Sequence, residues 1–190
     1  MLAFDIETFG LNPLEHDITV VALYGTLSDD GDDSEKKSVN STTRVVDTVL
    51  NFQQSPERRN ELCKTLVCYL NEAKTLFAFN GHRFDIPFIM HSLNVPPHIC
   101  EKWLLKLYDP FEESKLMNDV GTKLSNVLKR LNLEDKTASG LEAVRMAKDK
   151  EWTTLEDYCK KDAQLTYEVC VSLLKTGHDA LGNATIRLQT

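Results

Sequence analysis

The sequence predicts an α/β fold in which helices flank a mixed five-stranded sheet. Two observations indicate this class: the N-terminal segments have strand-like patterns, and strand-like and helix-like segments alternate after them. The size agrees, because 190 residues of which 42% are hydrophobic can bury a core without disulfides or a structural metal. We therefore expect a single domain over residues 1–190.

The first three elements have the pattern of an antiparallel meander. Residues 2–7 alternate apolar side chains with acids, residues 18–27 are rich in β-branched side chains, and residues 38–47 alternate weakly. Five acids around Gly31, between Asp29 and Glu35, favour a solvated hairpin turn or a partly disordered loop. They account for most of the net charge of −7, so the acidic total does not exclude a nucleic-acid partner.

Helices and strands alternate in the rest of the chain. Ser55 and Pro56 suit the N-cap and first position of a helix over residues 55–72, and a short strand over 75–79 follows. Pro87 suits the first turn of a helix over 87–93, which the pair Pro96-Pro97 is expected to end. We expect a fifth strand over 103–109 and helices over 123–131, 138–148 and 155–174.

Several protein classes are excluded by composition. No apolar run approaches the roughly 20 residues of a membrane span, and Met1 leads directly into the first strand without a basic region or a cleavable apolar segment. Five cysteines form no C-x-x-C pair, which argues against a disulfide framework and a structural zinc site. We therefore expect an intracellular protein, cytoplasmic or nuclear, that does not enter a membrane.

The first candidate site lies on the first strand. Asp5 and Glu7 are two residues apart, so both side chains leave the same face of the sheet, while Leu2, Phe4 and Ile6 leave the other. Carboxylates this close repel each other and lose solvation, and a divalent cation would relieve both costs. The alternative is an exposed edge strand with solvated acids.

The second candidate site lies at the end of the short strand. Residues 79–89 read Phe-Asn-Gly-His-Arg-Phe-Asp-Ile-Pro-Phe-Ile, so a strand turns on Asn80-Gly81 and delivers Phe84-Asp85 to the start of a helix. The alternative is that Asp85 is a plain helix N-cap.

The third candidate site lies on the longest predicted helix. Tyr158 and Asp162 are four residues apart, so the phenol and the carboxylate share one helix face. The alternative is a half-buried tyrosine beside a solvated acid. An apolar stripe on the same helix is expected to pack on the core: Leu155, Ala163, Thr166, Cys170 and Leu173.

Together these segments resemble a known enzyme family. LAFDIETFGL, FNGHRFDIPFI and DYCKKDAQLTY are similar to the three motifs of the DEDDy 3′-5′ exonucleases, found in the proofreading domain of family B DNA polymerases and in free-standing relatives. The resemblance spans residues 2–170 and implies a ribonuclease H-like fold. The histidine variant of the superfamily would place His where this chain has Asp157, so the tyrosine class fits. The motifs place the catalytic set at Asp5, Glu7, Asp85, Tyr158 and Asp162.

The resemblance also implies a mechanism with two metal ions. Asp5 would bridge both ions, Glu7 and Asp162 would complete the site beside the attacking water, and Asp85 would hold the ion beside the leaving group. Tyr158 would orient the water. Hard oxygen ligands favour Mg²⁺ or Mn²⁺.

The implied substrate is a single-stranded 3′ end of DNA or RNA. Leu11 and Phe84 are candidates to pack on the terminal nucleotide, and Asn80 is a candidate to contact its backbone. No polymerase-like segment follows the motifs, so a protein partner that presents the substrate is left open. Candidates for the phosphate path are Arg83, Lys123, Arg145, Lys148, Lys160 and Lys161.

Two other functions are compatible with the motifs. A noncatalytic nucleic-acid-binding or scaffold protein could share the fold, although such a protein would be expected to lose one or more of the acids. A metal-dependent phosphohydrolase that acts on mononucleotides would use similar carboxylates. DNA and RNA are not distinguished, because no motif reports a contact to the 2′-hydroxyl.

Overall fold

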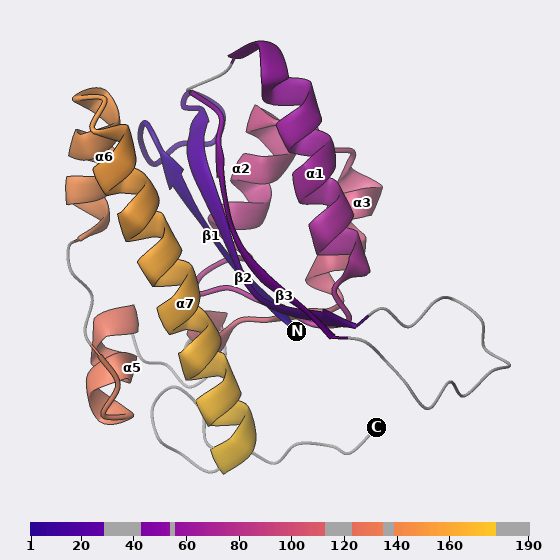
Figure 1. Cartoon of the computed structure of the whole chain (residues 1–190), viewed down its shortest axis with the longest axis vertical. Helices are drawn as coiled ribbons and strands as arrows, with labels where there is room; N and C mark the ends of the chain where they lie inside the picture. The colour runs from indigo at the N-terminus through magenta and orange to yellow at the C-terminus, as the bar shows by residue number, and fades with distance from the viewer. Residues whose placement is uncertain (29–42, 54–55, 113–122, 135–138, 178–190) are drawn as a thin grey trace, which may run out of the picture.

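The fold consists of one sheet between two helical layers. A computed structural model describes residues 1–28, 43–53, 56–112, 123–134 and 139–177. The strands are β1 (Leu2–Thr8), β2 (Ile18–Ser28), β3 (Thr43–Asn51), β4 (Leu76–Phe77) and β5 (Leu107–Tyr108). The helices are η1 (Pro56–Arg58), α1 (Arg59–Glu72), α2 (Asp85–Ser92), α3 (Pro97–Leu104), α5 (Leu124–Arg130), α6 (Gly140–Lys148) and α7 (Trp152–Thr176). Helices α1, α2 and α3 lie on one side of the sheet, and α5, α6 and α7 lie on the other (Figure 1).

The sheet is mixed, with the strand order β3-β2-β1-β4-β5. Strand β1 pairs antiparallel with β2 and parallel with β4, and β4 pairs parallel with β5. The predicted α/β class with a mixed five-stranded sheet is therefore confirmed. Because β1 is the central strand, the interpretation of Asp5 and Glu7 as acids on an exposed edge is wrong.

The alternation along β1 divides the two faces of the sheet. Leu2, Phe4 and Ile6 belong to the larger apolar cluster, together with side chains of α1, α2 and α3. Asp5 and Glu7 leave the opposite face, which α7 crosses. The central strand thus contributes apolar side chains to one face and acids to the other.

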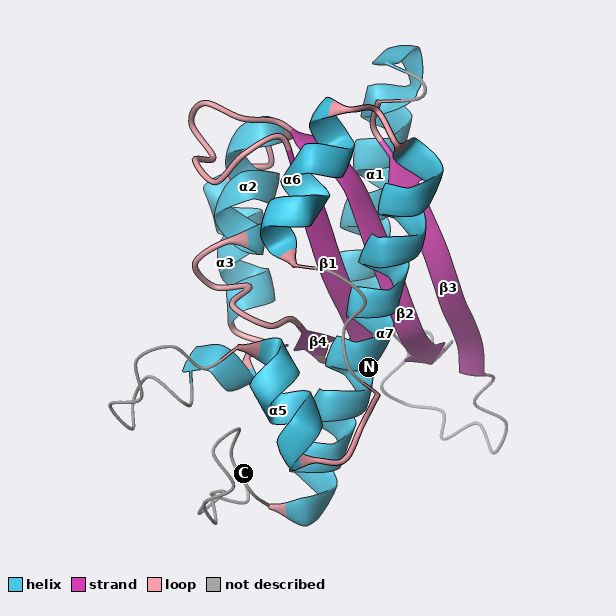
Figure 2. Ribbon diagram, turned by 90° about the vertical axis from the view of Figure 1, so that its left-hand side faces the viewer, coloured by secondary structure: helices cyan, strands magenta, loops and turns pink. Residues whose placement is uncertain are grey.

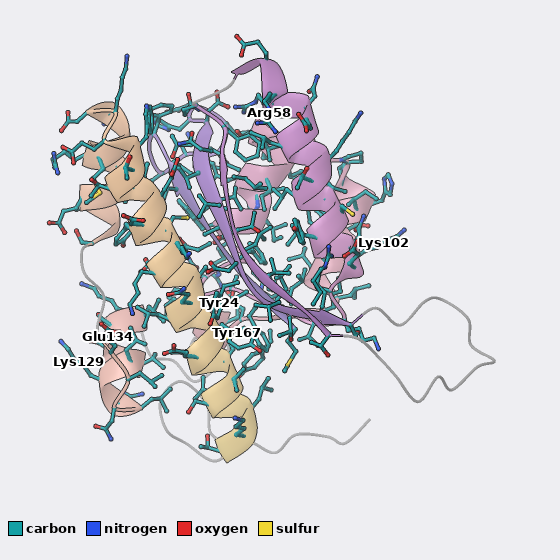
Figure 3. All side chains as sticks on the ribbon, viewed as in Figure 1. Tyr24, Arg58, Lys102, Lys129, Glu134 and Tyr167 are labelled. Atoms are coloured by element: carbon teal, nitrogen blue, oxygen red, sulfur yellow. The ribbon has the colours of Figure 1, made fainter. Side chains whose placement is uncertain are left out.

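Helix α7 closes the second face of the sheet. All five residues of its predicted apolar stripe are buried. Tyr167 of α7 contacts Tyr24 of β2 edge to face, with 5.5 Å between ring centroids (Figure 3). Helix α6 lies beside β1, and α5 packs on the C-terminal part of α7 (Figure 2). None of the described helices combines the length and apolar character needed to cross a membrane.

Two expected elements have different bounds in the structure. Residues 103–109 were expected to form a strand, but Trp103 belongs to α3 and the strand is restricted to Leu107–Tyr108. The preceding helix ends at Ser92, ahead of Pro96 as expected, but α3 was not expected; it begins at Pro97, because proline is favoured at the first helical position. The third strand begins at Thr43 and continues to Asn51; residues 38–42 and the acids 29–35 lie outside the described part.

The other helices agree more closely with their expected ranges. A 3₁₀ turn, η1, precedes α1, and Ser55 lies outside the described residues. Helix α6 begins with a capping box: Ser139 Oγ accepts the Glu142 N–H, and Glu142 accepts the Ser139 N–H. This cap defines where α6 starts beside the sheet. That residues 1–190 form one domain stays a prediction.

Candidate active site

The acids of β1 form the closest group of potential metal ligands. One oxygen of Asp5, one oxygen of Glu7 and the Cys159 sulfur all lie within 4.8 Å of one another. Asp5 is half-buried and Glu7 is buried. They sit at the centre of the sheet because β1 is flanked by β2 and β4, and they share a face because of the two-residue spacing.

Asp85 reaches the same region through the turn after β4. Asn80 has a left-handed backbone with φ 69°, and a Cβ on Gly81 would lie 2.4 Å from that of Ala78, so this tight turn requires glycine. Helix α2 begins at Asp85, and its N-cap residue is Phe84. The interpretation of Asp85 as a plain N-cap is therefore wrong.

The Asp85 carboxyl lies in a buried and negatively charged environment. The pKa of Asp85 is raised well above its usual range, first by burial and then by the charges of Asp5 and Asp109. Without a counter-charge, this position favours the protonated acid. A cation held between Asp5 and Asp85 would favour the ionised form.

Tyr158 and Asp162 of α7 face the acids of β1. Both side chains are buried, so the interpretation of Asp162 as a solvated acid is wrong. The pKa of the Tyr158 phenol is raised, chiefly by burial and then by the charges of Asp162, Glu7 and Asp5. The phenol therefore keeps its proton at neutral pH and acts as a hydrogen-bonding group rather than as a base.

All eight residues predicted for the site line one cavity. Its volume is about 150 Å³, which is enough for metal ions together with water molecules. The predicted residues are Asp5, Glu7, Leu11, Asn80, Phe84, Asp85, Tyr158 and Asp162; Ile6, Thr8, Phe79, Gly140 and Val144 complete the lining.

Leu11 lies on a braced turn at the cavity wall. Its side chain is 67% exposed, although the turn that carries it is well connected. Thr8 Oγ1 donates to the Gly10 carbonyl, and the Asn12 side chain accepts the Leu14 N–H. A Cβ on Gly10 would lie 2.5 Å from the His16 ring, so the turn packs closely on that ring. An exposed leucine is thus presented on a well-supported backbone.

Phe84 supplies a second apolar side chain to the wall. Its ring lies 4.8 Å from that of Phe88, which is fully buried in α2. Phe9, also in the first motif, packs edge to face on Trp152 and is not among the described residues that line the cavity. Phe9 therefore supports α7 rather than the cavity wall.

Two residues near the site were not predicted. The buried Cys159 thiol lies 3.4 Å from the Asp5 carbonyl oxygen and 3.6 Å from Asp5 Oδ2. Burial, with the charges of Asp5 and Glu7, raises the pKa of this thiol, so it stays protonated and donates to Asp5. Asp109, just after β5, accepts backbone N–H groups of Asn80 and His82.

Both residues had a signal in the sequence. Cys159 immediately follows Tyr158 within the third motif, on a helix expected to face the sheet. Asp109 ends a segment expected to be a strand, and the carboxyl ends of neighbouring parallel strands meet at one edge of a sheet. That edge is where the turn at Asn80 was already expected.

Most of the candidate phosphate-path residues form ion pairs with acids. Lys123 and Lys148 are exposed. A role for these six residues along a phosphate path stays a prediction. Four of the six residues form five ion pairs: Arg83–Glu112, Lys160–Asp47, Lys161–Glu134, Arg145–Asp149 and Arg145–Glu151.

The side chains in the cavity fit divalent metal ions. Four carboxylates from three separate segments supply only oxygen donors, the ligand type that Mg²⁺ and Mn²⁺ prefer. The burial of Glu7, Asp85 and Asp162 makes their negative charges costly in the absence of a cation. The donor set and its burial therefore both suit a hard cation.

Comparison with known proteins identifies the family. A comparison with curated proteins gives no match. Among solved structures, the chain is similar to the family B DNA polymerase from the hyperthermophilic archaeon Pyrobaculum calidifontis, with 16% identity and a TM-score of 0.64. The match covers 91% of this chain and 24% of the polymerase chain, so this chain spans about a quarter of that protein, and the likeness shows the fold alone. A family model described as RNase_H superfamily matches residues 2–174, and the chain therefore belongs to the ribonuclease H superfamily.

Proposed function

We propose that this protein is a metal-dependent 3′-5′ exonuclease of the DEDDy type, which removes nucleotides from single-stranded 3′ ends of DNA or RNA. One observation carries the proposal: three segments far apart in the sequence bring four acids and a tyrosine into one cavity of a ribonuclease H-like fold. A noncatalytic scaffold would have no need to keep four costly carboxylates together.

Two divalent ions, Mg²⁺ or Mn²⁺, would supply Lewis-acid activation of water and stabilise the charge on the phosphate and the leaving oxygen. Asp5 would bridge both positions from the central strand. Glu7 and Asp162 would complete the position beside the attacking water, and Asp85 would hold the position beside the leaving 3′ oxygen.

Tyr158 would orient the attacking water through its phenol. The raised pKa keeps the hydroxyl protonated, so Tyr158 can donate or accept a hydrogen bond without taking the proton of the water. Buried beside Asp162 on α7, the ring has little freedom, and this favours a fixed direction for the hydroxyl.

Leu11 and Phe84 would pack on the terminal nucleotide. Leu11 comes from the well-connected turn after β1, and the Phe84 ring packs against the ring of Phe88. Apolar and aromatic side chains pack on any base, so this packing predicts trimming without strong sequence preference. Asn80, which lines the same cavity, would contact the sugar-phosphate backbone.

The test is digestion of matched 5′-labelled DNA and RNA oligonucleotides, with Mg²⁺ and with Mn²⁺. The proposal predicts a ladder of progressively shorter labelled products, and resistance of a substrate with a 3′ phosphate. Asp162→Asn should abolish the ladder. The matched control is Asp157→Asn, which alters an exposed acid on the same helix that is not among the described cavity residues.

Other outcomes point to other functions. A labelled mononucleotide as the first product would mean attack from the 5′ end. Phosphate release from mononucleotides, without cleavage of oligonucleotides, would mean a phosphohydrolase. Tight binding of oligonucleotides with no cleavage under either metal would mean a noncatalytic binding protein.

A further inference from the structure

Asp109 is a buried acid whose role the proposed chemistry does not explain. It follows β5, its side chain is fully buried, and it lies behind the cavity wall rather than among the described residues that line it. A buried carboxylate is costly unless hydrogen bonds compensate for its lost hydration. Its partners therefore show what the charge is used for.

The partners of Asp109 lie mainly in the turn that carries Asn80 and Asp85. Oδ1 accepts the Asn80 N–H at 2.9 Å, and Oδ2 accepts the His82 N–H at 3.1 Å. Oδ2 also lies 3.2 Å from His82 Nδ1, and because an ionised carboxylate only accepts, that nitrogen carries its hydrogen toward Asp109. Oδ1 accepts one more N–H, from Phe111, at 3.0 Å.

These bonds fix the backbone of the turn. Asn80 has a positive φ, a left-handed conformation that asparagine tolerates better than most residues with a side chain. Asp109 accepts hydrogen bonds from the N–H groups on both sides of Gly81, those of Asn80 and His82. The Asn80 carbonyl in turn accepts a hydrogen bond from the Phe84 N–H at 3.0 Å. This bond connects the residues held by Asp109 to the start of α2.

We propose that Asp109 is a positioning residue of the active site, which fixes the turn from Asn80 to Phe84 and so sets the place of Asp85 opposite Asp5. The inference rests on the proposed function in one respect, that Asp85 holds a metal ion. Asp109 itself touches neither metal nor substrate. It acts through hydrogen bonds to backbone N–H groups, and the His82 ring N–H adds a further hydrogen bond to the Asp109 carboxylate.

The primary measurement is Mn²⁺ binding by titration calorimetry, which does not depend on catalysis. Asp109→Asn replaces one acceptor oxygen with an NH₂ group that would face N–H donors, so the turn loses hydrogen bonds that hold its backbone in place. Loss of such supporting contacts costs about 10- to 100-fold in metal affinity, and we expect the Mn²⁺ dissociation constant to rise by that factor.

His82→Ala separates positioning from charge. It keeps the Asp109 carboxylate and the backbone bonds, and removes only the ring contact. Loss of one hydrogen bond corresponds to about a 2- to 10-fold rise in the dissociation constant. If Asp109→Asn weakens Mn²⁺ binding while Asp109→Glu, which keeps the charge but displaces the acceptor oxygens, binds Mn²⁺ like the wild type, the effect is one of charge alone and the positioning role is overturned.

Two controls address surface charge and the overall stability. Arg58→Ala removes an exposed ion pair with Glu61, at residues that are not among the described lining of the cavity, and should leave Mn²⁺ affinity unchanged because such pairs contribute little. Trp103→Phe removes a bond to Asn71 on the other face of the sheet, and should lower the Tm without changing Mn²⁺ affinity.

The remaining outcomes are also decisive. Wild-type Mn²⁺ affinity in Asp109→Asn would overturn the proposal, and if that variant does not fold, His82→Ala decides by the same criterion. If the wild type binds Mn²⁺ but cleaves no oligonucleotide, the exonuclease proposal fails while the role of Asp109 is still measured. If the wild type binds no Mn²⁺, both fail.

Discussion

Replacement of Asp5 by asparagine should stabilise the metal-free protein and destabilise the metal-bound one relative to wild type. Asp5→Asn keeps the shape of the side chain and removes one negative charge from the central strand. In the absence of a cation that charge repels Glu7, whose ligand atom lies within 4.8 Å, and it raises the pKa of Asp85. With metal present, the same negative charge attracts the bound cation and stabilises the folded protein.

The magnitude follows from the distance. Two unit charges 4.8 Å apart repel by about 3.5 kcal/mol at an effective dielectric constant of about 20. Proton uptake by a neighbouring acid relieves part of this, so we expect a gain of about 1–3 kcal/mol in the free energy of unfolding. For a chain of this size that raises the Tm of the metal-free variant by about 2–12 °C.

The assay is thermal unfolding of both proteins in a chelator and in excess Mn²⁺. The wild type should gain about 4.1 kcal/mol at a free Mn²⁺ concentration about 1,000 times its dissociation constant, and Asp5→Asn should gain little, so their order of stability reverses. Asp157→Asn, an exposed acid of α7, should match the wild type in both conditions. A metal-free Asp5→Asn protein less stable than the wild type would refute the idea that crowded carboxylates destabilise this fold.

Three further perturbations test other parts of the site. Tyr158→Phe should slow single-turnover cleavage by about 10- to 1000-fold with Mn²⁺ dependence unchanged, whereas Asp162→Asn should also shift that dependence; a wild-type rate would remove Tyr158 from the catalytic set. Because the pKa of Asp85 is raised in the folded state, the metal-free protein is most stable below about pH 4, where this acid is protonated in both the folded and the unfolded state. That stability is lost as the pH rises through the folded-state pKa, because the unfolded state releases its proton first. Tm measured against pH in chelator should therefore fall across that range in the wild type and less in Asp85→Asn. Gly140→Ala should raise the free energy of unfolding by about 0.4–1 kcal/mol, because an added Cβ meets no atom of the described residues within 4 Å. It should also raise the KM for oligonucleotides because Gly140 lines the cavity; an unchanged KM would place the substrate elsewhere.

The predictable part of the fold follows from local periodicity. The alternation of residues 2–7 required Asp5 and Glu7 to share a face, and the structure shows Phe4 and Ile6 in the core on the other face. The helical spacing of Tyr158 and Asp162 placed both on one side of α7 in the same way. Such patterns are local, because the direction of a side chain depends on the backbone period alone.

The parts that were missed depend on competition between local signals or on tertiary contact. Proline both ends helices and begins them, so Pro97 gave no unique prediction, and Trp103 was placed in a strand rather than in α3. Asp109 ends a segment expected to be a strand, but the sequence does not show which backbone groups its side chain contacts. Its importance arises only when β5 pairs with β4 and brings it beneath the turn at Asn80, a contact between residues 29 positions apart.

The electrostatics of the cavity have a common origin. The pKa values of Asp85, Tyr158 and Cys159 are all raised, and in each case burial is the largest cause and the charge of Asp5 contributes. Each of these groups is therefore more favourable in its neutral form, although they lie on two separate elements and have different chemistry. A divalent cation beside Asp5 would act against all three shifts at once, because it replaces the negative potential that they share. The central strand thus accounts for the electrostatic character of the site, since a single carboxylate on β1 affects the protonation of groups on both α2 and α7.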